Sequence, residues 1–238
     1  MEKKERFMHQ EVLKVIACVT MLIDHFAAGV LPYMDVPYIE EIYYACRIIG
    51  RIAFPIYCFL LVEGMRHTRN AGKYILRLAI GILLAEIPFD FLLIGEFTWM
   101  YQNVMVTLTL GAIMLLCMQK TEKKWLKLLM VLPFALAADL TKSDYLGWGI
   151  AMIAVFALFE KLPLQLLGVA ALSVLMDSAW FPIFGVSISV EWFAVLAMLP
   201  IGLYSGRKLT HNRAIQWGFY LFYSLHLSIL WLVVELIW

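Results

Sequence analysis

Apolar blocks about as long as a membrane-spanning helix recur along this chain of 238 residues, and they constrain its fold more than any other feature. A helix needs about 20 residues to cross the roughly 30 Å of bilayer hydrocarbon. At 63% hydrophobic and 16% charged residues, the chain is also more apolar and less charged than a typical soluble domain. The sequence therefore predicts an all-α, polytopic transmembrane helical bundle in which residues 1–238 form a single integral membrane domain. We expect about nine spans, at residues 13–31, 47–66, 74–94, 103–119, 125–140, 147–160, 163–178, 190–204 and 219–237.

One apolar segment does not fit a helix. Residues 178–189 are interrupted by Pro182 and Gly185. Such a segment is tolerated at membrane depth only where protein covers it. We expect a re-entrant or interfacial loop.

Lysine and arginine are distributed very unevenly over the expected loops. With a cytoplasmic N-terminus, all but three of the nineteen Lys and Arg residues fall on the inner side. The three on the outer side are Arg47, Arg51 and Lys142. Because inner loops of membrane proteins are enriched in positive charge, this bias predicts a cytoplasmic N-terminus and, with an odd number of spans, an outer C-terminus.

Asp24 and His25 lie side by side in the middle of the first apolar block. Ionisable groups at membrane depth are costly, so they are functional candidates by default. Adjacent residues point about 100° apart on a helix, and both therefore have to be accommodated within the bundle. Histidine titrates near neutral pH, and a neighbouring carboxylate stabilises its charged form and fixes its tautomer. This pair predicts a centre for proton transfer.

Other polar side chains are expected within or at the edges of the later blocks. His226 lies near mid-depth in the last block, and an interhelical hydrogen bond is its structural alternative. Arg51 pairing with Asp24 or Asp90 would hold helices together. Pro88, between Glu86 and Asp90, would kink its helix. The backbone groups that lose their helical hydrogen bonds there would need other partners. The polar candidates on the outer side are Arg47, Arg51, Glu86, Asp90, Gln102 and Asn103.

A mostly basic group is expected at the inner ends of the second and third spans. Arginine and lysine bind phosphate by charge, and arginine also by paired hydrogen bonds. The group therefore suits a cytosolic polyanion such as a nucleotide or coenzyme A, although a basic loop can also serve topology alone. Its members are Glu63, Arg66, His67, Arg69, Lys73 and Arg77.

Several other kinds of chemistry lack support. The chain has no GxGxxG, P-loop or HExxH motif, and its four cysteines form no CxxC pair. His67 is expected at the inner surface, well away from His25 and His226. We therefore expect no metal site, and nothing in the sequence favours nucleic-acid binding.

These polar positions fall within runs that resemble the TraX family, membrane proteins named for the N-terminal acetylation of F-type pilin. The runs extend from the first expected span to the last. Two departures are Ser224, where the family often has proline, and the stretched run Asp144–Gly147. The matching stretches are Leu22–His25, Arg47–Ile56, Leu61–Asn70, Lys73–Tyr74, Arg77, Ala85–Asp90, Gln102–Val104 and Phe219–Leu227.

The resemblance implies an acetyltransferase of the bacterial cytoplasmic (inner) membrane that takes its acetyl group from cytosolic acetyl-CoA. His25, oriented by Asp24, would be the general base. His226 would be a second base or an acyl carrier. The basic group that includes Arg66 and Arg77 would bind coenzyme A. The acceptor, an amine or hydroxyl of a peptide, glycan or small molecule, stays open. Contacts to the substrate or oxyanion would come from Arg47, Arg51, Glu86, Asp90, Gln102 and Asn103.

Two other functions remain open on the same residues. A proton-coupled transporter would use Asp24, His25, Glu86 and His226 as a relay. A non-catalytic assembly factor would use the outer face as a docking groove. Neither the buried histidines nor the inner basic group is explained by the assembly factor.

Overall fold

Helices make up most of the part of the chain that can be described. The computed structural model describes residues 7–176, 180–183, 186–210 and 212–237. Three helical segments are long and apolar enough to cross a membrane, Gln10–Tyr33, Ile39–His67 and Ala214–Leu236. The predicted helical, membrane-type architecture is confirmed at this level, while the number of spans and their orientation stay predictions.

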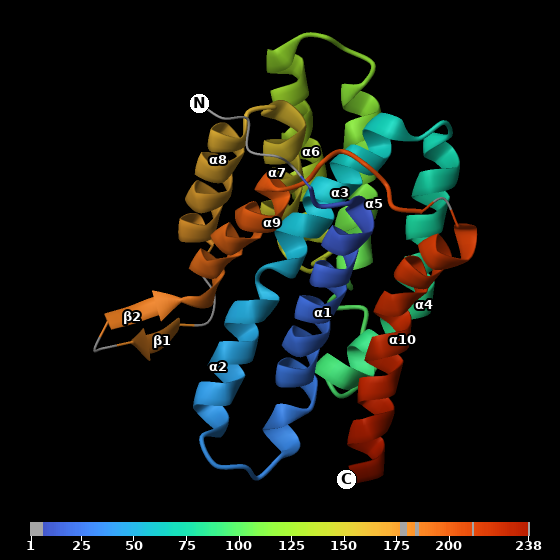
Figure 1. Cartoon of the computed structure of the whole chain (residues 1–238). Coiled ribbons are helices and arrows are strands. Elements are labelled where there is room, and N and C mark those ends of the chain that lie inside the picture. Colours follow the sequence, from blue (N-terminus) through green and yellow to red (C-terminus); the bar gives the residue numbers. More distant parts are fainter. Residues whose placement is uncertain (1–6, 177–179, 184–185, 211, 238) are drawn as a thin grey trace.

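The helices run up and down along one direction, with a small hairpin at one side (Figure 1). Most of the expected spans coincide with a helix. The elements are α1 Gln10–Gly29, η1 Leu31–Tyr33, α2 Ile39–Gly50, α3 Ala53–His67, α4 Ala71–Leu93, α5 Val104–Met118, α6 Lys124–Leu140, α7 Leu146–Leu158, α8 Leu162–Leu175, β1 Trp180–Ile183, β2 Val186–Ser189, η2 Val190–Ala197, α9 Met198–Gly202 and α10 Arg213–Ile237.

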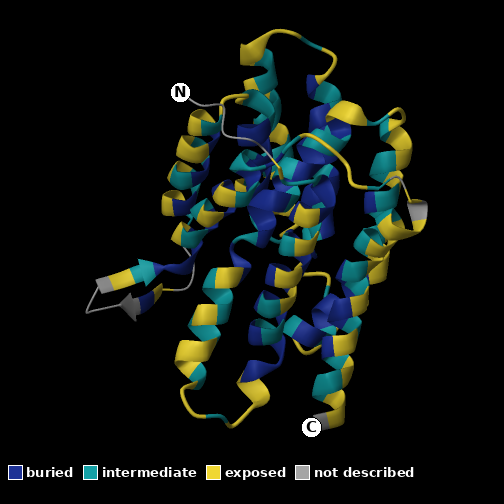
Figure 2. Ribbon diagram, in the orientation of Figure 1, coloured by how far each residue is buried: buried dark blue, intermediate teal, exposed yellow. Residues whose placement is uncertain are grey.

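The core lies where α1, α3, α5 and α7 meet (Figure 2). Leu13, Ile56 and Ile150 are fully buried there. The outer surface is apolar too, since Leu83 is 77% exposed and Leu236 is 85% exposed. Large exposed apolar surfaces mark contact with a membrane or a partner, so this pattern is typical of a chain surrounded by lipid.

A proline explains why the expected span 47–66 is two helices. Pro55 lacks an N–H, and its ring clashes with the carbonyl four residues earlier, that of Arg51. Helix α2 accordingly ends at Gly50, and α3 begins at Ala53. Helix α2 also begins at Ile39, earlier than predicted, because Glu40 and Glu41 in its first turn interrupt the apolar pattern.

A small hairpin replaces part of the loop expected at residues 178–189. Residues 180–183 and 186–189 form two antiparallel strands, with Trp180 opposite Ser189 and Phe181 opposite Ile188. Aromatic and β-branched residues favour strands, which explains the pairing where a loop was expected. Phe181 stacks on Tyr44 of α2 at 5.2 Å between ring centroids. The other residues of the expected loop, 178–179 and 184–185, lie outside the described residues.

The expected span 190–204 is mostly a tight helix. Residues Val190–Ala197 form the 3-10 helix η2, and only Met198–Gly202 continue as α-helix. Runs of 3-10 helix this long are uncommon. The neighbouring α8 has 14 residues, which at 1.5 Å each is about 21 Å, less than the thickness of the hydrocarbon core.

The start of α1 is tied to the loop that precedes α10. Met8 N–H donates to the Leu203 carbonyl at 3.0 Å, and Gln10 N–H donates to the Arg207 carbonyl at 2.9 Å. Glu11 accepts a hydrogen bond from the Leu209 N–H at 2.7 Å. These bonds bring residues about 200 positions apart into contact at one end of the molecule.

Candidate functional site: two cavities and a histidine pair

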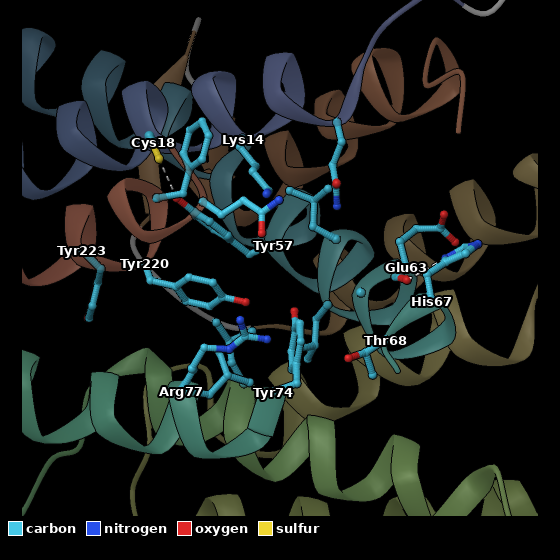
Figure 3. Close-up of a pocket in the computed structure, with 18 of the residues that line it drawn as sticks. Lys14, Cys18, Tyr57, Glu63, His67, Thr68, Tyr74, Arg77, Tyr220 and Tyr223 are labelled. Atoms are coloured by element: carbon cyan, nitrogen blue, oxygen red, sulfur yellow. Dashed lines mark hydrogen bonds between the residues drawn. The ribbon is translucent and has the colours of Figure 1, made fainter. Parts of the chain in front are cut away.

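A cavity of about 700 Å³, which we call the basic cavity, opens at the end of the molecule where α1 begins. Helices α1, α3, α4, α5 and α10 and the loop before α10 contribute its walls (Figure 3). The loop residues Arg207 and Lys208 are exposed at its mouth. Its cationic lining suits an anionic ligand. The cationic side chains and histidine that line it are Lys14, His67, Arg77, Arg207 and Lys208.

Arg77 is the most strongly positioned cation of the basic cavity. Its guanidinium lies 5.6 Å from the Tyr74 ring centroid and 5.4 Å from that of Tyr220. Its Nε is buried without a hydrogen-bond partner among the described residues. Aromatic faces on both sides orient an arginine while leaving its N–H groups available. This geometry is that of an anion-binding arginine.

The predicted inner group is divided by the structure. Glu63, His67 and Arg77 line the basic cavity, whereas Arg69 and Lys73 are exposed outside it. Arg66 donates at 3.3 Å to the carbonyls of Phe156 and Ala157, so it caps the end of α7.

Sequence reasoning missed the contributions of Lys14, Arg207 and Lys208 to this cavity. Lys14 carried a signal, because it is one turn before Cys18 on the face of α1 that also bears His25. The two loop residues carried none, since their position depends on bonds to the start of α1.

A second cavity, of about 480 Å³, is lined by Asp24 and His25, two of the three predicted catalytic residues. We call it the histidine cavity. Asp24 and His25 of α1 line it together with Arg47 of α2 and with Arg51, which directly follows α2. Exposed Ile94 and Tyr101 mark its rim. The tyrosines that line it are Tyr43, Tyr57, Tyr101 and Tyr145.

Asp24 binds arginines rather than His25. Its carboxylate accepts from Arg47 Nη1 at 2.8 Å and from Arg51 Nη2 at 2.9 and 3.0 Å. Arg51 also donates to Glu191 of η2 at 2.7 Å. The predicted pairing of Arg51 with Asp24 is therefore confirmed. The expected hydrogen bond that would orient His25 through Asp24 is not formed. Glu191 is only 4% exposed, so the ion-pair network is buried at this end too.

His25 bonds to His226 instead. Nδ1 of His25 lies 2.6 Å from Nε2 of His226, and Nδ1 of His226 lies 2.7 Å from the Phe222 carbonyl oxygen. A carbonyl only accepts, so Nδ1 of His226 carries the proton and its Nε2 accepts from Nδ1–H of His25. In the neutral pair the lone pair of His25 is therefore on Nε2. The hydrogen-bond network assigns these tautomers.

The remaining outer candidates are not brought to the histidine cavity. Asn103 is buried, donates to Glu86 and to the Ile82 carbonyl, and caps α5 by accepting from Met105 N–H. Asp90 accepts from the Thr98 N–H at 2.9 Å. Gln102 pairs its backbone with the loop at Lys142 and Asp144. The hydrogen bonds of these four residues hold together the connection between α4 and α5 and the loop beside it.

Asp144 adds a carboxyl group to the histidine cavity from the loop before α7. Burial raises the pKa of Asp144 to about 6, against the opposing effect of the positively charged Arg51. The loop is fixed by Thr107 of α5, whose hydroxyl donates to the Asp144 carbonyl. The stretched run of the sequence therefore lies at the wall of the site.

Gly50 allows α2 to approach Asp24 closely. A Cβ at position 50 would overlap Oδ1 and Cβ of Asp24. We expect Gly50→Ala to destabilise the protein by about 1–3 kcal/mol, the usual cost of overpacking, and to lower the Tm in detergent. Gly218→Ala is the matched control, because nothing lies within 4 Å of a Cβ there, and its Tm should stay the same or rise. Equal Tm changes in the two variants would contradict this packing.

Comparison with known proteins assigns the chain to a family. The family model described as TraX protein matches residues 9–234. The "Probable fimbrial assembly protein FimC, serogroup H1" of Dichelobacter nodosus is 31% identical over 241 residues, covering 92% of this chain and 92% of the relative. No solved structure matches the chain. The match extends over nearly all of the sequence, and the chain therefore belongs to the TraX family.

Proposed function

We propose that this protein is an acetyltransferase that spans the bacterial inner membrane several times. It transfers an acetyl group from cytosolic acetyl-CoA to an amine or hydroxyl acceptor on the other side. The observation that carries the proposal is the contact between the two cavities, which share the lining residues Met21, Tyr57 and Val104. One cavity suits an anionic donor, and the other contains an oriented histidine base.

The orientation follows from the charge distribution. In this proposal the nine expected spans cross the bilayer with the N-terminus inside, so the basic cavity faces the cytoplasm. Lys14 and His25 are eleven residues apart on α1, or about 16 Å at 1.5 Å per residue. Lys14 and Arg77 would bind the phosphates of coenzyme A, and its extended pantetheine arm would reach toward His25.

The chemistry requires only the side chains already described. Nε2 of His25 would accept the proton of the acceptor as its nitrogen or oxygen attacks the thioester carbonyl carbon. The tetrahedral intermediate then collapses with cleavage of the carbon–sulfur bond, and the imidazolium returns its proton to the departing thiolate. Arg47 and Arg51 line this cavity, and the Nε of each is buried without a partner among the described residues. Either could stabilise the oxyanion.

Acetyl-CoA binding is the direct test. A ligand present at a hundredfold excess over its Kd stabilises the folded state by about 2.7 kcal/mol, so purified protein in detergent should show a clear rise in Tm. Arg77→Gln should weaken binding at least about tenfold, because a hydrogen bond to a charged group is lost. Arg69→Gln, at the same end but outside the cavity, should bind normally. The absence of any rise with acetyl-CoA or coenzyme A over a wide concentration range would reject the proposal.

The name of the relative favours a second candidate. A fimbrial assembly protein could act without catalysis, by holding a fimbrial component in the histidine cavity. It could equally act by acetylating such a component. Complementation of a strain that lacks this protein separates the two, because a catalytically dead His25 variant would still support assembly only in the first case.

A further inference from the structure

Three side chains separate the two cavities. Met21 of α1, Tyr57 of α3 and Val104 at the start of α5 each line both of them. Cys18, one turn before Met21, lines only the basic cavity, and His25, one turn after it, lines only the histidine cavity. The boundary between the cavities therefore lies within two turns of α1, about 10 Å, on the path from the phosphate-binding end to the base.

Tyr57 contributes the largest side chain of this boundary and is held in place. Its hydroxyl lies 3.3 Å from Sγ of Cys18 (Figure 3). It is partly exposed, as expected for a ring with a cavity on each side. The surrounding Ile56 and Cys58 are fully buried, so α3 itself has little freedom to move the ring.

We propose that Tyr57, with Met21 and Val104, forms a partition that limits the acyl group to a short chain. The inference rests on the proposed transfer from acyl-CoA. The thioester carbonyl would meet the acceptor at the partition, with the pantetheine arm on one side and His25 on the other. A longer acyl chain would have to occupy the space of the tyrosine ring. The same ring keeps water of the histidine cavity away from the thioester.

Acyl selectivity tests the partition. One methylene group in an apolar site changes specificity by about 10–200-fold. Tyr57→Ala should therefore raise the ratio of butyryl to acetyl transfer at least tenfold, whereas Tyr57→Phe, which keeps the ring, should leave it unchanged. Tyr44→Ala is the matched control, because Tyr44 lines neither cavity, and it should leave the ratio unchanged. An unchanged ratio in Tyr57→Ala, with transfer of acetyl intact, would overturn the partition but not the proposed function.

Labelling of Cys18 tests the partition without any reaction. In a background of Cys46→Ser, Cys58→Ala and Cys117→Ser, Cys18 is the remaining thiol. A membrane-impermeant maleimide is added to proteoliposomes from the side of the histidine cavity. It should label Cys18 in Tyr57→Ala at least tenfold faster than in the unmodified background or in Tyr57→Phe. Equal rates would overturn the partition, whether or not acetyl-CoA binds. Met21→Ala, which opens the same boundary from α1, replaces Tyr57→Ala if that variant does not fold.

Discussion

His25→Ala is expected to lower kcat for acetyl transfer by about 10²–10⁴-fold, the usual contribution of a general base. The substitution also leaves Nε2 of His226 without its donor, at a cost of about 1–3 kcal/mol in stability. His25→Asn is therefore the sharper variant, because its amide can donate to His226 but has no basic lone pair. Acetyl-CoA binding, measured by thermal shift, should persist in both variants.

The partner histidine should behave differently. The tautomers make His226 an acceptor that orients His25, so His226→Gln, whose amide oxygen can accept the same hydrogen bond, should retain activity within about tenfold of the unmodified protein. His9→Gln, at a histidine that lines neither cavity, serves as the control for both series. If His226 were the principal base or carried the acyl group, His226→Gln would be as inactive as His25→Asn. Normal turnover in His25→Asn would remove His25 from the mechanism.

Arg51→Met is expected to cause the largest loss of stability of any single substitution considered. Arg51 is 7% exposed and joins Asp24 of α1 to Glu191 of η2. Removing one partner from a buried ion-pair network costs about 3–5 kcal/mol, because charges are left buried and unpaired. Arg51→Lys should be intermediate, since one ammonium group cannot reproduce the geometry of the guanidinium. Thermal unfolding in detergent measures both.

Two comparisons isolate the buried charge as the cause. Arg66→Met removes an arginine whose pair with Glu63 is long, at 3.5 Å, and partly exposed, together with its two hydrogen bonds to the carbonyls at the end of α7. It should cost about 1–2 kcal/mol, less than Arg51→Met. The double variant Arg51→Met, Glu191→Gln removes Arg51 together with one of its carboxylate partners and leaves Asp24 paired with Arg47. It should be more stable than Arg51→Met alone. A double variant as unstable as Arg51→Met would show that packing, not unpaired charge, is lost.

The sequence predicted the helices better than their contacts. Apolar blocks locate most helices, because a helix that crosses the bilayer needs a run of about 20 apolar residues, and such a run is visible in the sequence itself. The pairing of His25 with His226 joins positions 201 residues apart, and only the packing of α10 on α1 creates it. Glu191 was overlooked because its burial depends on the tight winding of η2, which composition does not reveal.

The hairpin and the basic cavity also depend on contacts between residues that local sequence does not reveal. Residues 180–189 are apolar enough for a membrane segment. Composition does not reveal that residues 180–183 and 186–189 pair as strands, with Phe181 stacked on Tyr44 of α2. Arg77 was predicted from its place in a basic run. The neighbouring Lys208 was not, because its position follows from the hydrogen bonds that tie the loop before α10 to the start of α1.

The bond between the two histidines also has a mechanical consequence. Among the described elements, helix α10 makes extensive contacts only with α1 and α4. Much of the rest of its surface is exposed, for example at Leu225 and Ile229. A slide of α10 by one residue, about 1.5 Å, would break the 2.6 Å contact between His25 and His226. The proposed basicity of His25 is thus linked to the position of a peripheral helix, and in a membrane the lipid thickness would become a variable of the proposed transfer reaction.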